Sequence, residues 1–387
     1  MNFKDCLKNK NLNYFIGTVV FLVLYLIIFT HSFDTKYLIH SMDGEEKYYL
    51  EELPKLIAKE NTTLGSPFLR FGTATLATTI SGATGLDRFD SIIYLNIIVY
   101  FLTVLFLFWT AIPRFIKHIK SKDSPISRML LTLIVMTNPV MTKYTFSIHP
   151  DIILLCLFLV VCYSMMVKKG FTKVFWITAI CSLTLIFKEN IIPLTPFLFV
   201  YFLDDEKIKK QAVKHAISFG AVLFTIYWFI FIHLDSIYKV FMTNRSLAKY
   251  VAFQQQVSYG IFNVVHNVGL KLFLEIYTFK LAMVYNVLWL FMIPAFIKIQ
   301  KNKKPLDWIM NWFYALVGIG VFTVAATSAG IGEKYFLFYS MLPFFYLFFI
   351  RNNTHIDLAK NRKYVYAVII GNIASLFLYF LLATKFY

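Results

Sequence analysis

Long apolar runs recur from one end of the 387-residue chain to the other, and this repetition limits its fold more than any other feature. Hydrophobic residues make up 58% of the sequence and charged residues only 15%, so a water-soluble domain would have too little polar surface to cover its core. Most of the runs are long enough for transmembrane helices. The sequence therefore predicts an all-α polytopic membrane protein, with residues 1–387 in a single transmembrane domain.

The loops between the apolar runs predict the direction of each helix, because lysine and arginine are enriched on the cytoplasmic side of a membrane. With the N-terminus inside, the inner segments hold 23 of the 38 Lys and Arg residues. The predicted topology places the N-terminus in the cytoplasm and the C-terminus outside the cell (inner) membrane. We predict about eleven transmembrane helices, at residues 14–30, 90–112, 129–146, 152–167, 174–187, 191–203, 216–233, 281–297, 306–327, 335–350 and 364–384.

The net charge of +17 could also suggest a protein that binds nucleic acid, but the positions of the charges argue against that class. The basic residues lie in short loops beside the apolar runs, where they contact anionic lipid head groups. The sequence has no basic groove with interleaved aromatic residues, as single-stranded nucleic acids require. We therefore expect membrane lipids as partners, and no nucleic acid.

Two predicted outer segments are long, residues 31–89 and 234–280, and each is expected to contain an interfacial helix. Within the first segment, residues 67–85 are moderately apolar and rich in Thr and Gly. They could form a twelfth transmembrane helix, but that would invert every later loop and remove the charge asymmetry. An interfacial or re-entrant segment is the better interpretation.

Residues 174–203 form two apolar arms around a turn that contains Lys188 and Glu189. At 1.5 Å per residue each arm spans about 20 Å, less than the roughly 30 Å of hydrocarbon in a bilayer. The turn is therefore expected below the outer surface. Charges at that depth need partners or a water-filled cavity, and they indicate function. A mutually neutralised pair near the head groups is the alternative.

Several more polar residues are predicted on the same outer side of the membrane. Their common side and depth indicate a functional site. Asp151 also suits the first turn of a helix, where a carboxylate meets the positive end of the helix dipole, so a capping role stays open. The segment around Glu333 could likewise be an interfacial anchor. The residues of this group are Arg70, His149, Asp151, Glu333, Lys334 and Tyr335.

The densest acidity of this basic chain is the stretch HSMDGEEKYYLEEL, at residues 40–53. Tyr and Leu residues repeat there at helical spacing, so Glu51 and Glu52 fit the solvated face of an interfacial helix. Asp43 comes before that helix, early in the predicted outer segment, and is the next acidic residue after Asp34. We interpret Asp43 as chemical and the later carboxylates as structural.

The order of these features resembles the GT-C superfamily of integral membrane glycosyltransferases, which includes protein mannosyltransferases and enzymes that modify lipid A or O-antigen. Asp43 in SMDGEEKYY and Asp151 in SIHPDIILL match the two acidic positions of the family. LIFKENIIPLTP matches its lysine-containing turn, and GIGEKYFLFYSMLPFF resembles its late tyrosine segment, with Lys334 where arginine is commoner.

The resemblance implies a hexosyltransferase that moves a sugar from polyprenyl phosphate to a hydroxyl of a glycan, lipid or protein acceptor, with inversion. Charge develops on the donor phosphate as the glycosidic bond breaks, and Lys188 and Arg70 are expected to stabilise it. Asp43 would accept the proton of the attacking hydroxyl. Asp151 would orient the acceptor or hold a metal. A divalent metal is possible, and no cofactor is certain.

Two other functions stay open. A polyprenyl-linked polysaccharide polymerase or ligase uses Arg and His in a large later outer loop, and residues 234–280 contain Arg245 and His266. A lipid-linked sugar transporter or flippase also uses buried charges, although such proteins often have two related halves with matching broken helices. The short arms at residues 174–203 have no counterpart in the second half of the chain.

Overall fold

The computed structural model describes residues 9–32, 71–118, 122–147, 150–167, 170–185, 187 and 362–386. All regular elements in these ranges are helices, which confirms the all-α prediction for this part of the chain. The helices are α2 (Lys10–Ser32), α6 (Phe71–Thr84), α7 (Arg88–Phe106), η3 (Leu107–Ala111), α8 (Ile112–His118), α9 (Pro125–Met136), α10 (Pro139–Thr145), α11 (Asp151–Val167), α12 (Gly170–Leu185) and α22 (Arg362–Phe386).

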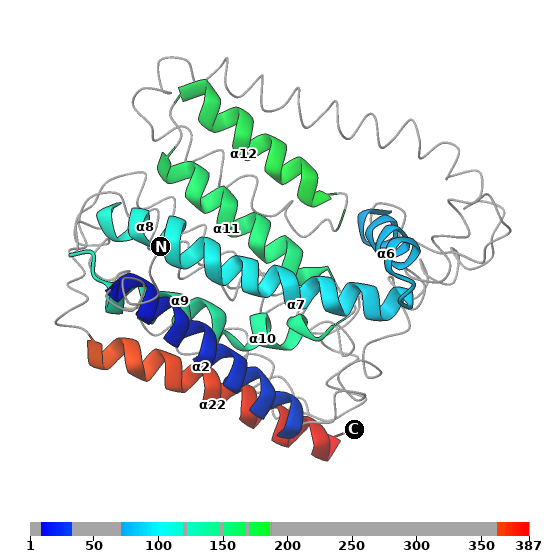
Figure 1. Ribbon diagram of the computed structural model, residues 1–387, viewed down its shortest axis with the longest axis horizontal. Helices are drawn as coiled ribbons and strands as arrows, with labels where there is room; N and C mark the ends of the chain where they lie inside the picture. Colours follow the sequence, from blue (N-terminus) through cyan, green and yellow to red (C-terminus); the bar gives the residue numbers. More distant parts are fainter. Residues whose placement is uncertain are drawn as a thin grey trace, which may run out of the picture.

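The first helices run side by side in alternating directions (Figure 1). After α2, the continuous segment α7–η3–α8 runs in the opposite direction, and α9 and α10 return. α11 then runs back again, and α12 pairs with α11. α9 packs against both α2 and α22, so the C-terminal helix joins the bundle beside the N-terminal one. The predicted direction of each helix across the membrane stays a prediction.

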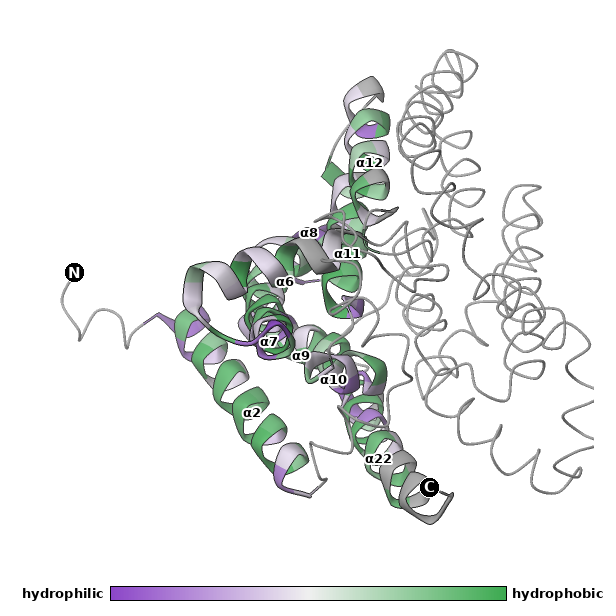
Figure 2. Ribbon diagram, turned by 90° about the vertical axis from the view of Figure 1, so that its right-hand side faces the viewer, coloured by the Kyte–Doolittle hydropathy of each residue, from purple (hydrophilic) through white to green (hydrophobic). Residues whose placement is uncertain are grey.

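Two of the described segments, Lys10–Ser32 and Arg88–Lys117, are long and apolar enough to cross a membrane. α2 buries one face, with Leu22 and Phe29 fully covered, while Leu24 and Ile28 on its other face are 54% and 56% exposed. Figure 2 shows that α2 is coloured as hydrophobic along most of its length. Such a helix leaves apolar side chains uncovered by protein, as a lipid-facing helix does. The remaining predicted spans stay predictions.

The second segment changes its helical pitch near its end. The Ile112 N–H donates to the Leu107 carbonyl, five residues back, in the π-helical turn η3. Pro113 follows directly; it has no N–H, and its ring would clash with the carbonyl four residues earlier in a regular helix. A wider turn accommodates such a residue without ending the helix. The helix therefore continues to His118, beyond the predicted end at residue 112.

The predicted third span, residues 129–146, is not one continuous helix. α9 ends at Met136 and α10 begins at Pro139. Pro139 disfavours the helical conformation of the residue before it, and Asn138 has φ −54° and ψ 130°. The Asn138 side chain instead accepts from the Val140 N–H (3.0 Å) and caps α10. The predicted span 129–146 is thus two helices, with the interruption near its middle.

Buried hydrogen bonds connect three other helices to this break. The Tyr100 hydroxyl of α7 donates to the Met136 carbonyl (2.9 Å), and the Tyr25 hydroxyl of α2 pairs with the Thr142 hydroxyl (3.1 Å). From α22, the Asn372 amide donates to the Ile134 carbonyl (3.0 Å). These side chains partner backbone and hydroxyl groups that the interrupted helix exposes, so we call them the break network.

α6 lies at the start of α7 and crosses it rather than running alongside (Figures 1 and 2). It has 14 residues, about 21 Å of helix, which is less than the roughly 30 Å of hydrocarbon. Its end is set by Gly85, whose φ of +73° is a left-handed conformation suited to glycine. The interfacial or re-entrant placement of residues 67–85 stays a prediction.

The described charges separate to the two ends of the bundle. The end where α2 starts and α8 stops is rich in basic residues, and we call it the basic end (Figure 1). Asp123 is the one acidic residue among the described charges there. The opposite end, where α11 starts, holds acids and bases in similar numbers. The basic end carries Lys10, Arg114, Lys117, Lys122, Arg128, Lys173, Arg362 and Lys363.

Candidate functional site

Asp151 is the predicted catalytic residue that falls within the described residues. It is the first residue of α11, as the sequence predicts, and its side chain has no exposed surface. Pro150 stands before it, and the Pro150 carbonyl accepts from the Leu154 N–H (3.0 Å) to close the first turn. The sequence thus places a fully buried carboxylate at the end of the bundle opposite to the basic end.

The surroundings of Asp151 are held by α7 and α10, which both pack against α11. On α7, the buried Asn96 amide donates to the Ser147 carbonyl (2.6 Å), in the connection that leads from α10 to α11. Ser147 is fully buried, and its N–H donates to the Tyr144 carbonyl (3.3 Å). The start of α11 is therefore fixed by backbone hydrogen bonds and by a side chain from a neighbouring helix.

Lys143 is a further candidate that the sequence reasoning missed. It lies in α10, its side chain is only 9% exposed, and its Nζ atom is 5.7 Å from the centre of the Tyr144 ring. Its position inside the predicted span 129–146 was the available signal, because an ionisable residue within a transmembrane segment indicates function. Lys143 adds a positive charge to the element that directly precedes Asp151.

A buried carboxylate at the start of a helix has a defined chemical capacity. The aligned peptide dipoles give the start of α11 a partial positive charge, and the Asp151 side chain lies at this end of the helix. An ionised carboxylate accepts hydrogen bonds and can orient a hydroxyl group or take its proton. The arrangement suits the recognition of a polar group that enters the bundle from this end.

Metal binding at this site stays a prediction. Among the described residues, no group of three His, Cys, Asp or Glu side chains is close enough to hold an ion. Asp151 alone supplies one carboxylate ligand, and a divalent oxygen-bound ion takes several. The neighbouring candidates His149 and Asp43 lie outside the described residues.

Most predicted site residues also lie outside the described part of the chain. Two of them are direct sequence neighbours of described residues. α6 begins directly after Arg70, and the described residue Phe187 directly precedes Lys188. α6 and the end of α12 both lie toward the end of the bundle where α11 starts (Figure 1). The undescribed site residues are Asp43, Arg70, His149, Lys188, Glu189, Glu333, Lys334 and Tyr335.

Comparisons of the chain with protein-family models, with curated proteins and with solved structures find no match.

Proposed function

We propose that this protein is an integral membrane glycosyltransferase of the GT-C type, which moves a hexose from a polyprenyl-phosphate donor to an acceptor hydroxyl on the outer side of the cell membrane. The observation that carries the proposal is the fully buried Asp151 carboxylate at the start of α11. Its placement agrees with the second acidic position of the family that the sequence resembles.

The distribution of charge supports the orientation that this function needs. A polytopic protein keeps its basic residues on the cytoplasmic side, so the basic end faces the cytoplasm and Asp151 faces outward. The polyprenyl-linked sugar then meets the site at the outer surface. In this proposal Asp43 is the base, Asp151 orients the acceptor, and Lys188 and Arg70 contact the donor phosphate.

The buried charges around α10 and α11 support chemistry in a site shielded from water. Electrostatic interactions are stronger there than in solution, so a cation near the donor phosphate stabilises its developing charge more effectively. Lys143 joins the candidates for this role because it is buried one helix before Asp151. His149, Glu189, Glu333, Lys334 and Tyr335 are the remaining proposed substrate contacts.

Mass analysis of surface glycans, with and without the gene, tests this function. Loss of one sugar substituent, restored by the wild-type gene and not by Asp43→Asn, is the expected result. A collapsed chain-length ladder would indicate a polymerase or ligase instead. Accumulation of an unmodified precursor on the cytoplasmic side would indicate transport.

Transport is the second candidate, and the break between α9 and α10 favours it. Discontinuous helices near the middle of the membrane form substrate sites in many secondary transporters. Within the described part of the chain, Asn138 Nδ2 and Asn372 Oδ1 at this break are buried without a hydrogen-bond partner, so a polar ligand could contact them. The position of Asp151 at the bundle end, away from this break, favours the transferase.

A further inference from the structure

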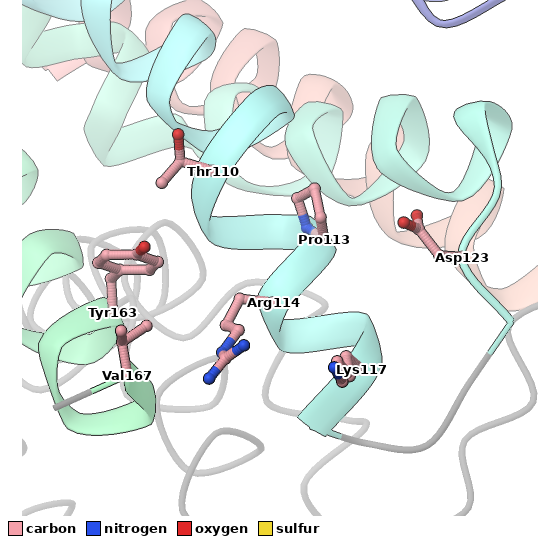
Figure 3. A pocket seen from close by; sticks show the side chains of 7 residues that line it. All are labelled: Thr110, Pro113, Arg114, Lys117, Asp123, Tyr163 and Val167. Carbon is pink, nitrogen blue, oxygen red and sulfur yellow. The ribbon is translucent and has the colours of Figure 1, made fainter. Parts of the chain in front are cut away.

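A second site lies at the basic end of the bundle, far along α11 from Asp151. A cavity of about 610 Å³ opens there between α8, α11 and the residues that lead into α9 (Figure 3). Its lining combines cations, hydroxyl groups and apolar side chains. The lining residues are Thr110, Pro113, Arg114, Lys117, Asp123, Tyr163 and Val167.

The described lining of the cavity has a net positive charge. Asp123, the one acidic residue among these described lining residues, is held by Arg128, whose Nε and Nη2 atoms donate to the two carboxylate oxygens at 2.8 and 2.5 Å. Arg114 and Lys117 make no ion pair with another described residue, and both side chains are exposed. Two cations on successive exposed positions of α8 are therefore available to an anionic ligand.

The shape of the cavity follows from the change of pitch before α8. Thr110 belongs to the π-helical turn and Pro113 follows it, so the wall of the cavity on this side is the widened part of the helix. On the other side, the Tyr163 ring lines the cavity and packs edge-on against Phe106, with the ring centres 5.5 Å apart. Figure 3 shows Arg114 extending from α8 toward Tyr163 and Val167.

The depth of this cavity matches the head-group layer of a membrane. The apolar segment Arg88–Lys117 has 30 residues, about 45 Å of helix, and some 20 of those residues fill the hydrocarbon. Arg114 and Lys117, in its last turns, lie beyond that length when the segment starts at the opposite surface. Their side chains then lie at the level of lipid phosphates, with Pro113 and Val167 toward the acyl chains.

We infer that this cavity binds the phosphate group of an anionic membrane phospholipid from the leaflet at the basic end. Arginine binds phosphate through parallel hydrogen bonds and lysine as a point charge, and basic pockets between transmembrane helices on the cytoplasmic side bind anionic head groups. This lipid is distinct from the proposed sugar donor, because Asp151 starts α11 at the opposite end.

Binding of phosphatidylglycerol to the purified full-length protein in detergent tests the inference, with native mass spectrometry to count bound lipids. Each cation near an anionic lipid contributes about fivefold in affinity, equivalent to roughly 1 kcal/mol. Arg114→Gln with Lys117→Gln should therefore weaken the tightest phosphatidylglycerol site by about 25-fold. Phosphatidylcholine, which has no net charge, should bind the wild type no better than this double variant.

Arg362→Gln with Lys363→Gln is the matched control, since both residues are exposed at the same end and neither lines the cavity. An equal loss in this control would show diffuse attraction and overturn the inference. Inorganic phosphate that displaces phosphatidylglycerol at low millimolar concentration would assign the cavity to a water-soluble phosphate and overturn the lipid. If the double variant does not purify, Lys117→Gln against Lys363→Gln decides the same question.

Discussion

The Asp151 carboxylate is completely covered by protein, although removal of a charged group from water costs several kcal/mol. The start of α11 offers a favourable dipole, which offsets part of the cost. In the proposed transferase, this buried position is where Asp151 would orient the acceptor.

Replacement of Asp151 by asparagine keeps the shape of the side chain and removes its charge. Because a neutral amide is easier to bury, thermal stability in detergent should be unchanged or slightly higher. Consumption of a polyprenyl-phosphate sugar should fall on the order of 10²-fold or more, since the acceptor loses its orienting carboxylate. Wild-type turnover in Asp151→Asn would make this residue a helix cap.

The Tyr100 hydroxyl gives a test of the break network. Tyr100→Phe leaves the Met136 carbonyl without this donor in a buried site, and such a loss costs about 1 kcal/mol. Tyr94→Phe is the matched control, because Tyr94 lies on the same helix and is 54% exposed. Unfolding in a titration with sodium dodecyl sulfate should be shifted by Tyr100→Phe alone. Equal shifts in the two variants would contradict a role for this hydrogen bond.

The interruption between α9 and α10 is a point where several helices of the bundle meet. The Asn138 side chain caps the N-terminus of α10. α2, α7 and α22 each contribute one polar side chain that forms a hydrogen bond in the same region. Hydrogen bonds between helices are one of the few specific forces in a bilayer, where lipid is as apolar as the helix faces. The break therefore fixes which helices are neighbours.

Asn138→Ala tests this role. The substitution removes a buried cap whose oxygen accepts from the Val140 N–H, and the expected loss of stability is about 1 kcal/mol. Asn9→Ala removes a comparable cap at the exposed start of α2, where Asn9 Oδ1 accepts from the Asn11 N–H (3.1 Å). That terminal turn can fray, so thermal unfolding should change little. A larger effect for Asn9→Ala would contradict the account.

Sequence patterns predicted the helices whose boundaries coincide with a change in hydropathy. α2 and α11 are examples, and Asp151 falls at the predicted start of α11. The break at Asn138 was missed because the apolar residues on both sides raise the average over the whole run. The Asn138–Pro139 dipeptide was the local signal. The π-helical turn has no such pattern apart from Pro113, since pitch depends on packing against neighbouring helices.

In the candidate site too, the residues at a change in hydropathy could be predicted and those inside an apolar run were missed. Asp151 stands at a hydropathy boundary and was found. Lys143 stands inside an apolar run and was overlooked, although its charge alone marked it. Which helices pack beside these residues could not be predicted, because apolar faces of similar composition do not specify their neighbours. Only the contacts of α7, α10 and α11 show this.

Across the whole molecule, the described charges fall into a basic end and a mixed end. The separation predicts one orientation in the membrane, with the basic end inside. A C-terminal alkaline phosphatase fusion after Tyr387 should be active, because this enzyme folds outside the cytoplasm, and a C-terminal green fluorescent protein should be dark when exported unfolded. The reverse pair of results would contradict this orientation.

Release of polyprenyl phosphate from a labelled polyprenyl-phosphate sugar, by the full-length protein in liposomes, tests the proposed transfer most directly. The account predicts that the wild type consumes the donor in the presence of acceptor and that Asp43→Asn lowers this rate by roughly 10²–10⁴-fold, as for the loss of a general base. Glu51→Gln and Glu52→Gln should keep the wild-type rate. A donor that crosses the liposome membrane intact, without any release of polyprenyl phosphate, would contradict the account.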